Sequence, residues 1–91
     1  MAHNLHDDPA QGRFELVENG HLAFAEYVRG PSTLLIFWVE AARPLRGKGA
    51  AGRLMQGIAE LAIREGRKIE PRCGYAAAWL RRHREYRHLV S

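Results

Sequence analysis

The sequence predicts a small α+β fold, an antiparallel β-meander followed by a β-α-β-α segment. Short alternating or β-branched runs with turn signals between them fill residues 13–41, and a helical stripe of apolar residues occupies residues 49–65. The chain has 91 residues, which suits one domain. We place that domain at residues 13–91, after a flexible polar lead-in over residues 1–12.

Three strands are expected in the first half of the chain. Residues 13–17 alternate polar and apolar side chains, and Asn19-Gly20 favours a tight hairpin turn into residues 21–28. After a second turn, residues 33–41 form a nearly uninterrupted β-branched and aromatic run. This run predicts a central strand that is covered on both faces.

Helices and a strand alternate in the second half. From Leu54 onward, the apolar residues of segment 49–65 fall at the spacing of one stripe of an amphipathic helix. A short strand at 68–71 and a second helix from Gly74 to about His83 complete the order β-β-β-α-β-α. The strand–helix–strand connection implies one parallel pairing after the antiparallel meander.

The composition narrows the function classes. Apolar residues make up 46% and charged residues 26%, as in ordinary globular proteins, and no apolar run approaches the roughly 18 residues of a transmembrane helix. Cys73 is the only cysteine, so no intrachain disulfide forms, which favours a cytoplasmic location. The five histidines form no metal-binding motif, and we expect no metal.

Charge is distributed unevenly along the chain. Residues 1–42 carry two arginines and six acids, a net charge of −4, whereas residues 43–91 carry twelve lysines and arginines and four acids, a net charge of +8. A basic half favours an anionic partner. Nucleic acid, a phosphorylated cofactor and a membrane surface all remain open on this ground.

The segment Leu45–Gly52 (LRGKGAAG) is a candidate anion-binding loop. It lies between the apolar third strand and the amphipathic helix, where glycines allow a sharp turn and the helix start favours an anion. Arg46 and Lys48 add positive charge. A short glycine-rich segment can equally be a solvated connector, and this one matches neither the P-loop nor the dinucleotide-binding fingerprint.

Arg46–Ala51 (RGKGAA) resembles the acetyl-CoA signature [RQ]-x-x-G-x-[GA] of the GNAT acetyltransferase superfamily. The segment Pro71–Tyr86 resembles the closing segment of a small stand-alone GNAT group, and the resemblance extends from Arg13 to Val90. It implies a minimal GNAT-like fold with the acetyl-CoA loop between the third strand and the first helix. The chain departs from that group at residues 38–42 (WVEAA), where HTEVP is usual, and at Arg84, where a proline is usual.

The resemblance also implies which residues hold coenzyme A. Backbone amides of the loop hold the pyrophosphate, neighbouring side chains line the pantetheine arm, one cysteine lies near the thioester, and two basic residues reach the 3′-phosphate. These residues are Arg46, Gly47, Lys48, Gly49, Ala50 and Ala51 for the loop, Ala41, Ala42, Leu45, Tyr75 and Ala76 for the arm, Cys73 for the thioester, and Arg82 and His83 for the 3′-phosphate.

Two residues are candidates for catalysis. Cys73 precedes a helix start and follows Arg72, and both neighbours favour a reactive thiolate. It could form a transient acetyl-cysteine or give a proton to the departing coenzyme A, and the alternative is a small buried filler. Glu40 could act as general base for the amine, and the alternative is a solvated strand end or an ion pair with Arg43.

These features predict an acetyl-CoA-dependent N-acetyltransferase acting on an amine of a protein or small molecule. The alternative is a non-catalytic coenzyme A or acyl-CoA-binding module. A nucleic-acid-binding domain is less favoured, because no nucleic-acid motif is present. The chain lacks the helices that larger GNAT enzymes have between their first two strands, so we expect an acceptor site that is open or completed by a second subunit in a homodimer.

Overall fold

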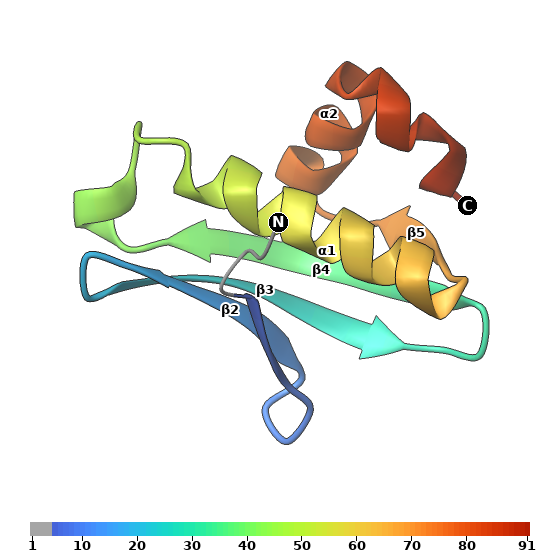
Figure 1. The fold of residues 1–91 in the computed structure, drawn as a ribbon, viewed down its shortest axis with the longest axis horizontal. Helices are drawn as coiled ribbons and strands as arrows, with labels where there is room; N and C mark the ends of the chain where they lie inside the picture. Colours follow the sequence, from blue (N-terminus) through green and yellow to red (C-terminus); the bar gives the residue numbers. More distant parts are fainter. Residues whose placement is uncertain (1–4) are drawn as a thin grey trace.

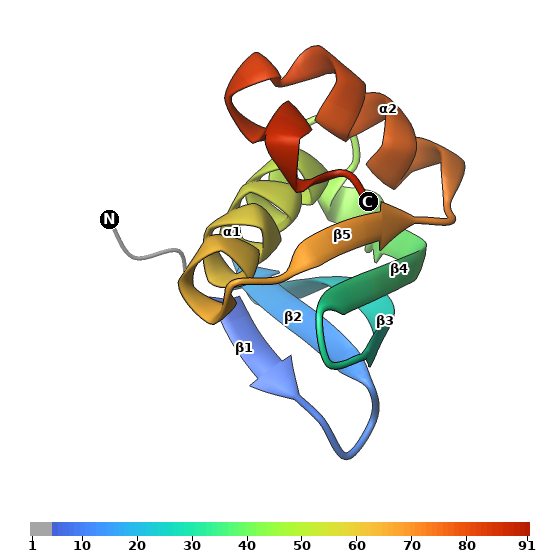
Figure 2. The same cartoon turned by 90° about the vertical axis from the view of Figure 1, so that its right-hand side faces the viewer.

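A five-stranded sheet with both helices on one of its faces makes up the computed structural model, which describes residues 5–91 (Figures 1 and 2). The strands occur in chain order, antiparallel up to β4, and β5 then joins β4 in parallel. The predicted meander, crossover helix and closing helix are confirmed. The elements are β1 (Leu5–Asp8), β2 (Arg13–Glu18), β3 (His21–Arg29), β4 (Thr33–Ala41), η1 (Arg43–Leu45), α1 (Ala50–Glu65), β5 (Lys68–Pro71), α2 (Gly74–Arg82) and η2 (Arg84–Leu89).

Strand β1 lies where the sequence analysis expects a flexible lead-in. It pairs antiparallel with β2, with Leu5 opposite Leu16 and Asp8 opposite Arg13. The expectation is therefore wrong for this strand, and residues 1–4 of the expected lead-in lie outside the described residues. The LHDD sequence has one apolar residue, Leu5, which packs against the core, so it shows no apolar alternation. The strand therefore depends on tertiary contacts and could not be recognised from its pattern.

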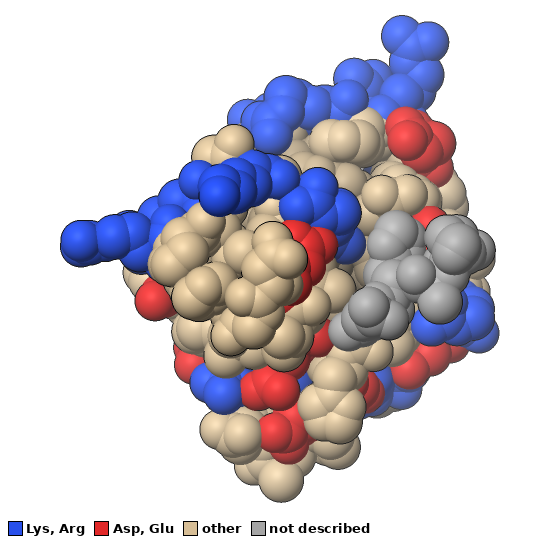
Figure 3. All heavy atoms as spheres, turned by 60° about the vertical axis from the view of Figure 1, so that its left-hand side comes forward, with Lys and Arg blue, Asp and Glu red and all other residues tan. Residues whose placement is uncertain are grey.

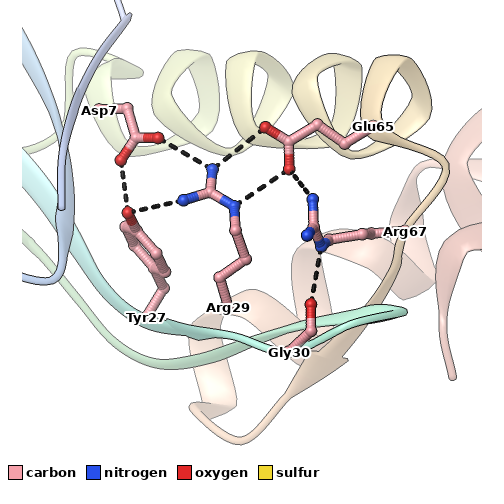
Figure 4. Close-up of polar contacts among 6 residues, drawn as sticks. All are labelled: Asp7, Tyr27, Arg29, Gly30, Glu65 and Arg67. Atoms are coloured by element: carbon pink, nitrogen blue, oxygen red, sulfur yellow. Dashed lines mark hydrogen bonds and ion pairs between the residues drawn. The ribbon is translucent and has the colours of Figure 1, made fainter.

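One arginine joins β1 to the end of α1 (Figure 4). Arg29 on β3 donates to Asp7 at 2.9 Å, to both carboxylate oxygens of Glu65 at 3.1 Å, and to the Tyr27 hydroxyl at 3.1 Å. The Tyr27 hydroxyl in turn donates to Asp7, and Arg67 binds Glu65 from the other side. Burial alone lowers the pKa of Arg29, but its hydrogen bonds with Glu65 and Asp7 outweigh that effect and raise it.

The core lies between α1 and the inner face of the sheet. The apolar stripe that the sequence predicts on α1 is buried, and the C-terminal Gly66 ends the helix in a left-handed conformation at φ +68°. Within residues 5–91, no helix is long and apolar enough to cross a membrane. The largest fully buried side chains are Phe14, Leu34, Ile36, Leu54, Met55, Ile58, Ile69 and Leu80.

Strand β4 is central in the sheet but is covered on only one face. Leu34 and Ile36 are fully buried under the helices, whereas Phe37 and Trp38 are 43% and 52% exposed. The pairing with β3 shifts at this point, so that Phe37 has no cross-strand partner. The prediction of a strand covered on both faces is wrong, because both helices lie on the same side of the sheet (Figure 2).

Candidate functional site

The sheet opens between the second half of β4 and the start of α2. Strand β5 pairs with β4 only from Thr33 to Ile36, after which the chain turns away into α2. The backbone amides of Arg72 and Cys73 both donate to the Ile36 carbonyl, at 2.8 and 3.3 Å. Beyond that point, the edge of β4 that faces away from β3 has no strand beside it among the described residues. A ligand can therefore lie against this edge.

A glycine-rich loop leads from β4 into α1 at the same end of the sheet. Gly47 and Gly49 take left-handed conformations, with φ of +76° and +84°, which glycine adopts without steric cost. The loop is anchored by two arginines, because Arg46 Nε donates to the Ala41 carbonyl at 3.1 Å and Arg53 donates to the Lys48 carbonyl at 2.8 Å. The loop conformation is thus fixed by both glycine and side-chain contacts.

The start of α1 presents unused hydrogen-bond donors. In residues 5–91 the amides of Gly49, Ala50, Ala51 and Gly52 donate to no backbone or side-chain acceptor, and the first helical bond is from Arg53 to Gly49. The first turn has no acidic residue. These amides and the dipole of a 16-residue helix favour a bound anion.

A pocket of about 310 Å³ lies against this helix start. It brings together most of the predicted loop and part of the predicted pantetheine wall. Its lining residues are Ala41, Leu45, Arg46, Gly47, Gly49, Ala50, Ala51, Gly52 and Tyr75. The predicted residues that do not line it are Ala42, Lys48, Cys73, Ala76, Arg82 and His83.

Gly52 is a pocket residue that belongs to the predicted glycine-rich segment but is not among the residues predicted to hold the cofactor. A Cβ at this position would lie 3.5 Å from Trp79 Nε1 and 3.8 Å from the Tyr75 hydroxyl, so the glycine sits where α1 and α2 pack closely. The signal available in the sequence was a glycine in the first turn of the helix, just beyond the end of the loop signature.

Tyr75 lines the pocket from the first turn of α2. Burial raises the pKa of its hydroxyl, the Cys73 thiol adds to that rise, and the Arg82 guanidinium opposes it. Neither Cys73 nor Arg82 lines the pocket itself.

Cys73 caps the N-terminus of α2. Its Sγ accepts a hydrogen bond from the Ala76 amide at 3.4 Å, and its side chain is half-buried. Arg72, which the sequence analysis considers a cation for this thiol, instead pairs with Glu70 at 2.7 Å. The helix start is thus the electrostatic feature that the structure places next to Cys73.

His83 ends α2 by packing against it. Its ring stacks on Trp79 with centroids 3.8 Å apart, and its Nδ1 lies 2.7 Å from the Trp79 carbonyl. Arg82 is exposed beside it. Of the two residues implied for the 3′-phosphate, Arg82 has the more exposed side chain, whereas the His83 ring is held against Trp79.

Glu40 is exposed near the end of β4. Its carboxylate accepts a hydrogen bond from Trp38 Nε1 at 2.9 Å, and the described residues show no ion pair with Arg43. Glu40 lies four residues beyond Ile36 on β4, or roughly 13 Å along a strand, whereas Cys73 lies beside Ile36. The two candidate catalytic groups thus occupy different positions along the opening.

Basic side chains surround the pocket side of the molecule. In Figure 3, lysines and arginines gather over the upper part of the surface, where α2 and η2 lie, and most acidic residues lie lower. Exposed members of this set are Arg43, Arg46, Lys48, Arg81, Arg82, Arg84 and Arg87. Basic residues of the loop, α2 and η2 therefore make this side of the molecule positive, whereas Arg67 and Lys68 of the basic half lie beyond the C-terminal end of α1.

A separate cluster joins His6, Asp8 and Glu15, whose possible ligand atoms all lie within 4.8 Å of one another. The sequence predicts no metal site, and the cluster has no motif in the sequence because it depends on the pairing of β1 with β2. Both carboxylates already have partners, since Gln11 donates to Asp8 at 2.7 Å and Arg13 to Glu15 at 2.6 Å.

The sequence was compared with protein-family models and with curated proteins. The family model described as GCN5-related N-acetyl-transferase matches residues 13–89, from the start of β2 to the end of η2. No curated protein matches the chain. The glycine-rich loop, the pocket and Cys73 all lie within the matched range.

Proposed function

Because the chain belongs to the GCN5-related N-acetyltransferase family, we propose that it transfers the acetyl group of acetyl-CoA to an amine. The observation that carries this proposal is the set of four unused amides at the start of α1, beside a pocket of about 310 Å³. Family membership supports acetyl transfer, and the amides supply a site for a pyrophosphate.

Under this proposal, the chain binds coenzyme A along the opening in the sheet. The α1 amides hold the pyrophosphate, with Arg46 and Lys48 adding charge. Ala41, Leu45 and Tyr75 line the pantetheine arm, which follows the unpaired edge of β4. This direction brings the thioester toward Cys73, at the far end of the opening.

The transfer step needs few side chains. The amine nitrogen bonds to the thioester carbonyl carbon, the carbon–sulfur bond breaks, and the amine loses a proton. We assign Cys73 as the acid that protonates the departing sulfur, and Glu40 as the final acceptor of the amine proton, which reaches it through a chain of waters because Glu40 lies roughly 13 Å from Ile36 along β4. The helix start beside Cys73 Sγ then stabilises the thiolate that remains until solvent reprotonates it.

Ala51→Glu tests the cofactor site. The new carboxylate would lie in the first turn of α1, where it is compatible with the helix dipole but repels a pyrophosphate. We expect calorimetry to show acetyl-CoA affinity weakened at least about tenfold, or about 1.4 kcal/mol. Ala51→Gln is the neutral control of similar size and should retain more affinity. Equal affinity of wild type and Ala51→Glu would refute the phosphate-loop assignment.

Cys73→Ser tests the proposed acid. Serine keeps an acceptor for the Ala76 amide, so α2 should remain capped. We expect acetyl-CoA affinity to stay within about twofold while the transfer rate falls at least about tenfold, because serine is a much weaker acid than cysteine. An acetyl adduct on wild-type Cys73 in intact-mass spectra would assign the covalent role instead. Binding without any turnover would favour the coenzyme A-binding module.

A further inference from the structure

The uncovered face of the sheet carries a group of four side chains that we call the acidic–aromatic face: Phe24, Glu26, Trp38 and Glu40. The strand register sets Phe24 opposite Glu40 and Glu26 opposite Trp38. Directly paired residues of antiparallel strands point to the same face of a sheet. The hydrogen bond from Trp38 Nε1 to Glu40, at 2.9 Å, confirms that these two side chains meet.

The two carboxylates of this face lack a cationic partner. Within residues 5–91, neither Glu26 nor Glu40 forms an ion pair. Other acids on the same side of the sheet are neutralised locally, because Arg13 holds Glu15 at 2.6 Å and a further arginine holds Glu70 at 2.7 Å. Arg13 lies opposite Glu26 in the register of β2 and β3, but its guanidinium is bound to Glu15, so the acidic–aromatic face keeps a net negative charge.

The aromatic rings of the face suit a cation as well. Trp38 is 52% exposed, which leaves its ring open to solvent. The guanidinium of Arg13 already lies over the Phe24 ring, 4.9 Å from its centroid. A cation over an aromatic ring is attracted by the ring quadrupole, and neighbouring carboxylates strengthen the preference.

The acidic–aromatic face adjoins the proposed reaction centre. Trp38 lies two residues beyond Ile36, roughly 7 Å along β4, and the Ile36 carbonyl binds the Cys73 amide. The opening between β4 and α2 separates the two. When one lysine of a polypeptide segment is held at this face, the flexible four-carbon stem of a neighbouring lysine can extend from Trp38 into the opening.

We propose that the acidic–aromatic face binds the acceptor as a lysine-bearing cationic polypeptide segment. This inference rests on the proposed acetyl transfer and adds to it the chemistry of the acceptor. The two substrates then use opposite sides of the molecule, since the polyanionic coenzyme A binds on the basic, helical side (Figure 3) and the cationic acceptor on the acidic, sheet side. An extended segment suits two adjacent, open strands.

A second copy of the chain fits this face less well. In a twofold dimer centred here, Glu26 and Glu40 of one protomer would meet the same carboxylates of the other. Like charges across an interface oppose association. Nucleic acid is excluded from this face by the same charge.

The direct test is peptide binding measured without coenzyme A. The probe is a capped Gly-Lys-Gly-Lys-Gly peptide, and its control replaces both lysines with norleucine. Fluorescence of the exposed Trp38 reports binding, while Trp79, which is only 4% exposed, provides a background that Trp38→Phe isolates. We expect the lysine peptide alone to change the Trp38 signal, with weaker binding at higher salt.

Glu26→Gln tests the charge, since the proposed mechanism gives Glu26 no chemical role. We expect a Kd for the lysine peptide raised about three- to tenfold, a similar rise in acceptor KM with kcat unchanged, and an unaltered acetyl-CoA affinity. Glu85→Gln removes the same charge on η2, on the other side of the molecule, and should change the peptide Kd less than about twofold.

Three outcomes would overturn the inference. They are equal binding of the lysine and norleucine peptides, an unaltered peptide Kd in Glu26→Gln, and a dimer in sedimentation that Trp38→Phe dissociates. The last would make this face a self-interface. Loss of acetyl-CoA binding in Ala51→Glu is measured separately, so failure of the cofactor site and failure of the acceptor face are distinguishable.

Discussion

Two glycines at the start of α1 serve different purposes although they are only three residues apart. Gly49 has a φ of +84°, and a Cβ there would come within 2.9 Å of the Arg53 guanidinium. Gly52 has an ordinary helical backbone, and its Cβ would make only van der Waals contact with α2. The first glycine is needed for the backbone conformation, whereas the second is not required by the backbone and lines the pocket without a side chain.

Paired substitutions separate these two roles. We expect Gly49→Ala to lower the free energy of unfolding by about 1–2 kcal/mol, because alanine is strained in the left-handed region. Gly52→Ala should raise it by about 0.5–1 kcal/mol, because alanine is the better helix former. Urea titrations followed by circular dichroism measure both. Destabilisation by Gly52→Ala would show that the contact with α2 is tighter than the structure indicates.

At this scale, the sequence predicts local features well and long-range ones poorly. The loop residues Arg46–Ala51 are contiguous, so their signature can be found without a structure. The position of Glu40 beside Trp38 and opposite Phe24 depends on the β3–β4 register, which includes a shift. The two-residue period of a strand predicts that Trp38 and Glu40 share a face, but it cannot predict which residues of β3 lie opposite them.

Among the elements, β1 depends most on contacts that are distant in the sequence. Its link to α1 passes through Arg29, which is held by Asp7 on one side and Glu65 on the other. The other strands and both helices have patterns of their own, either alternation or a helical stripe, and were predicted within about two residues of their observed ends. β1 has no such pattern and was missed.

Arg29→Met tests this link. The substitution keeps a long apolar stem but leaves two partly buried carboxylates without their shared cation. We expect the free energy of unfolding to fall by about 2 kcal/mol and the β1 amides to exchange hydrogen faster than those of β3. Arg64→Met, at an exposed position in the last turn of α1, is the matched control and should have little effect. Unchanged exchange in β1 would contradict the role of Arg29.

The whole molecule should lose stability in alkaline solution. Burial is the first cause that raises the pKa of each of the three tyrosines, Tyr27, Tyr75 and Tyr86, above the ordinary value of 10.0. A pKa raised by folding means that the folded state holds the proton more tightly. The stability that these hydroxyls contribute is therefore complete below pH 10 and is lost as the pH rises through the folded-state values.

Urea unfolding between about pH 8 and 11 measures this loss. We expect the free energy of unfolding to fall above about pH 10, together with a delayed rise of tyrosinate absorbance in the native protein. Tyr27→Phe removes one of the three groups and should make the fall shallower. A stability curve that is flat across this range would contradict the expectation.

The order of the strands has a consequence for biosynthesis. Since neighbours in the sheet are also neighbours in the chain, β1 to β4 can pair by successive hairpins as they leave the ribosome, N-terminus first. Their inner face, with Phe14, Leu34 and Ile36, then stays uncovered until the α1 segment has been translated. The nascent chain thus passes through a stage with an exposed apolar sheet, which is the stage at which a chaperone would bind it.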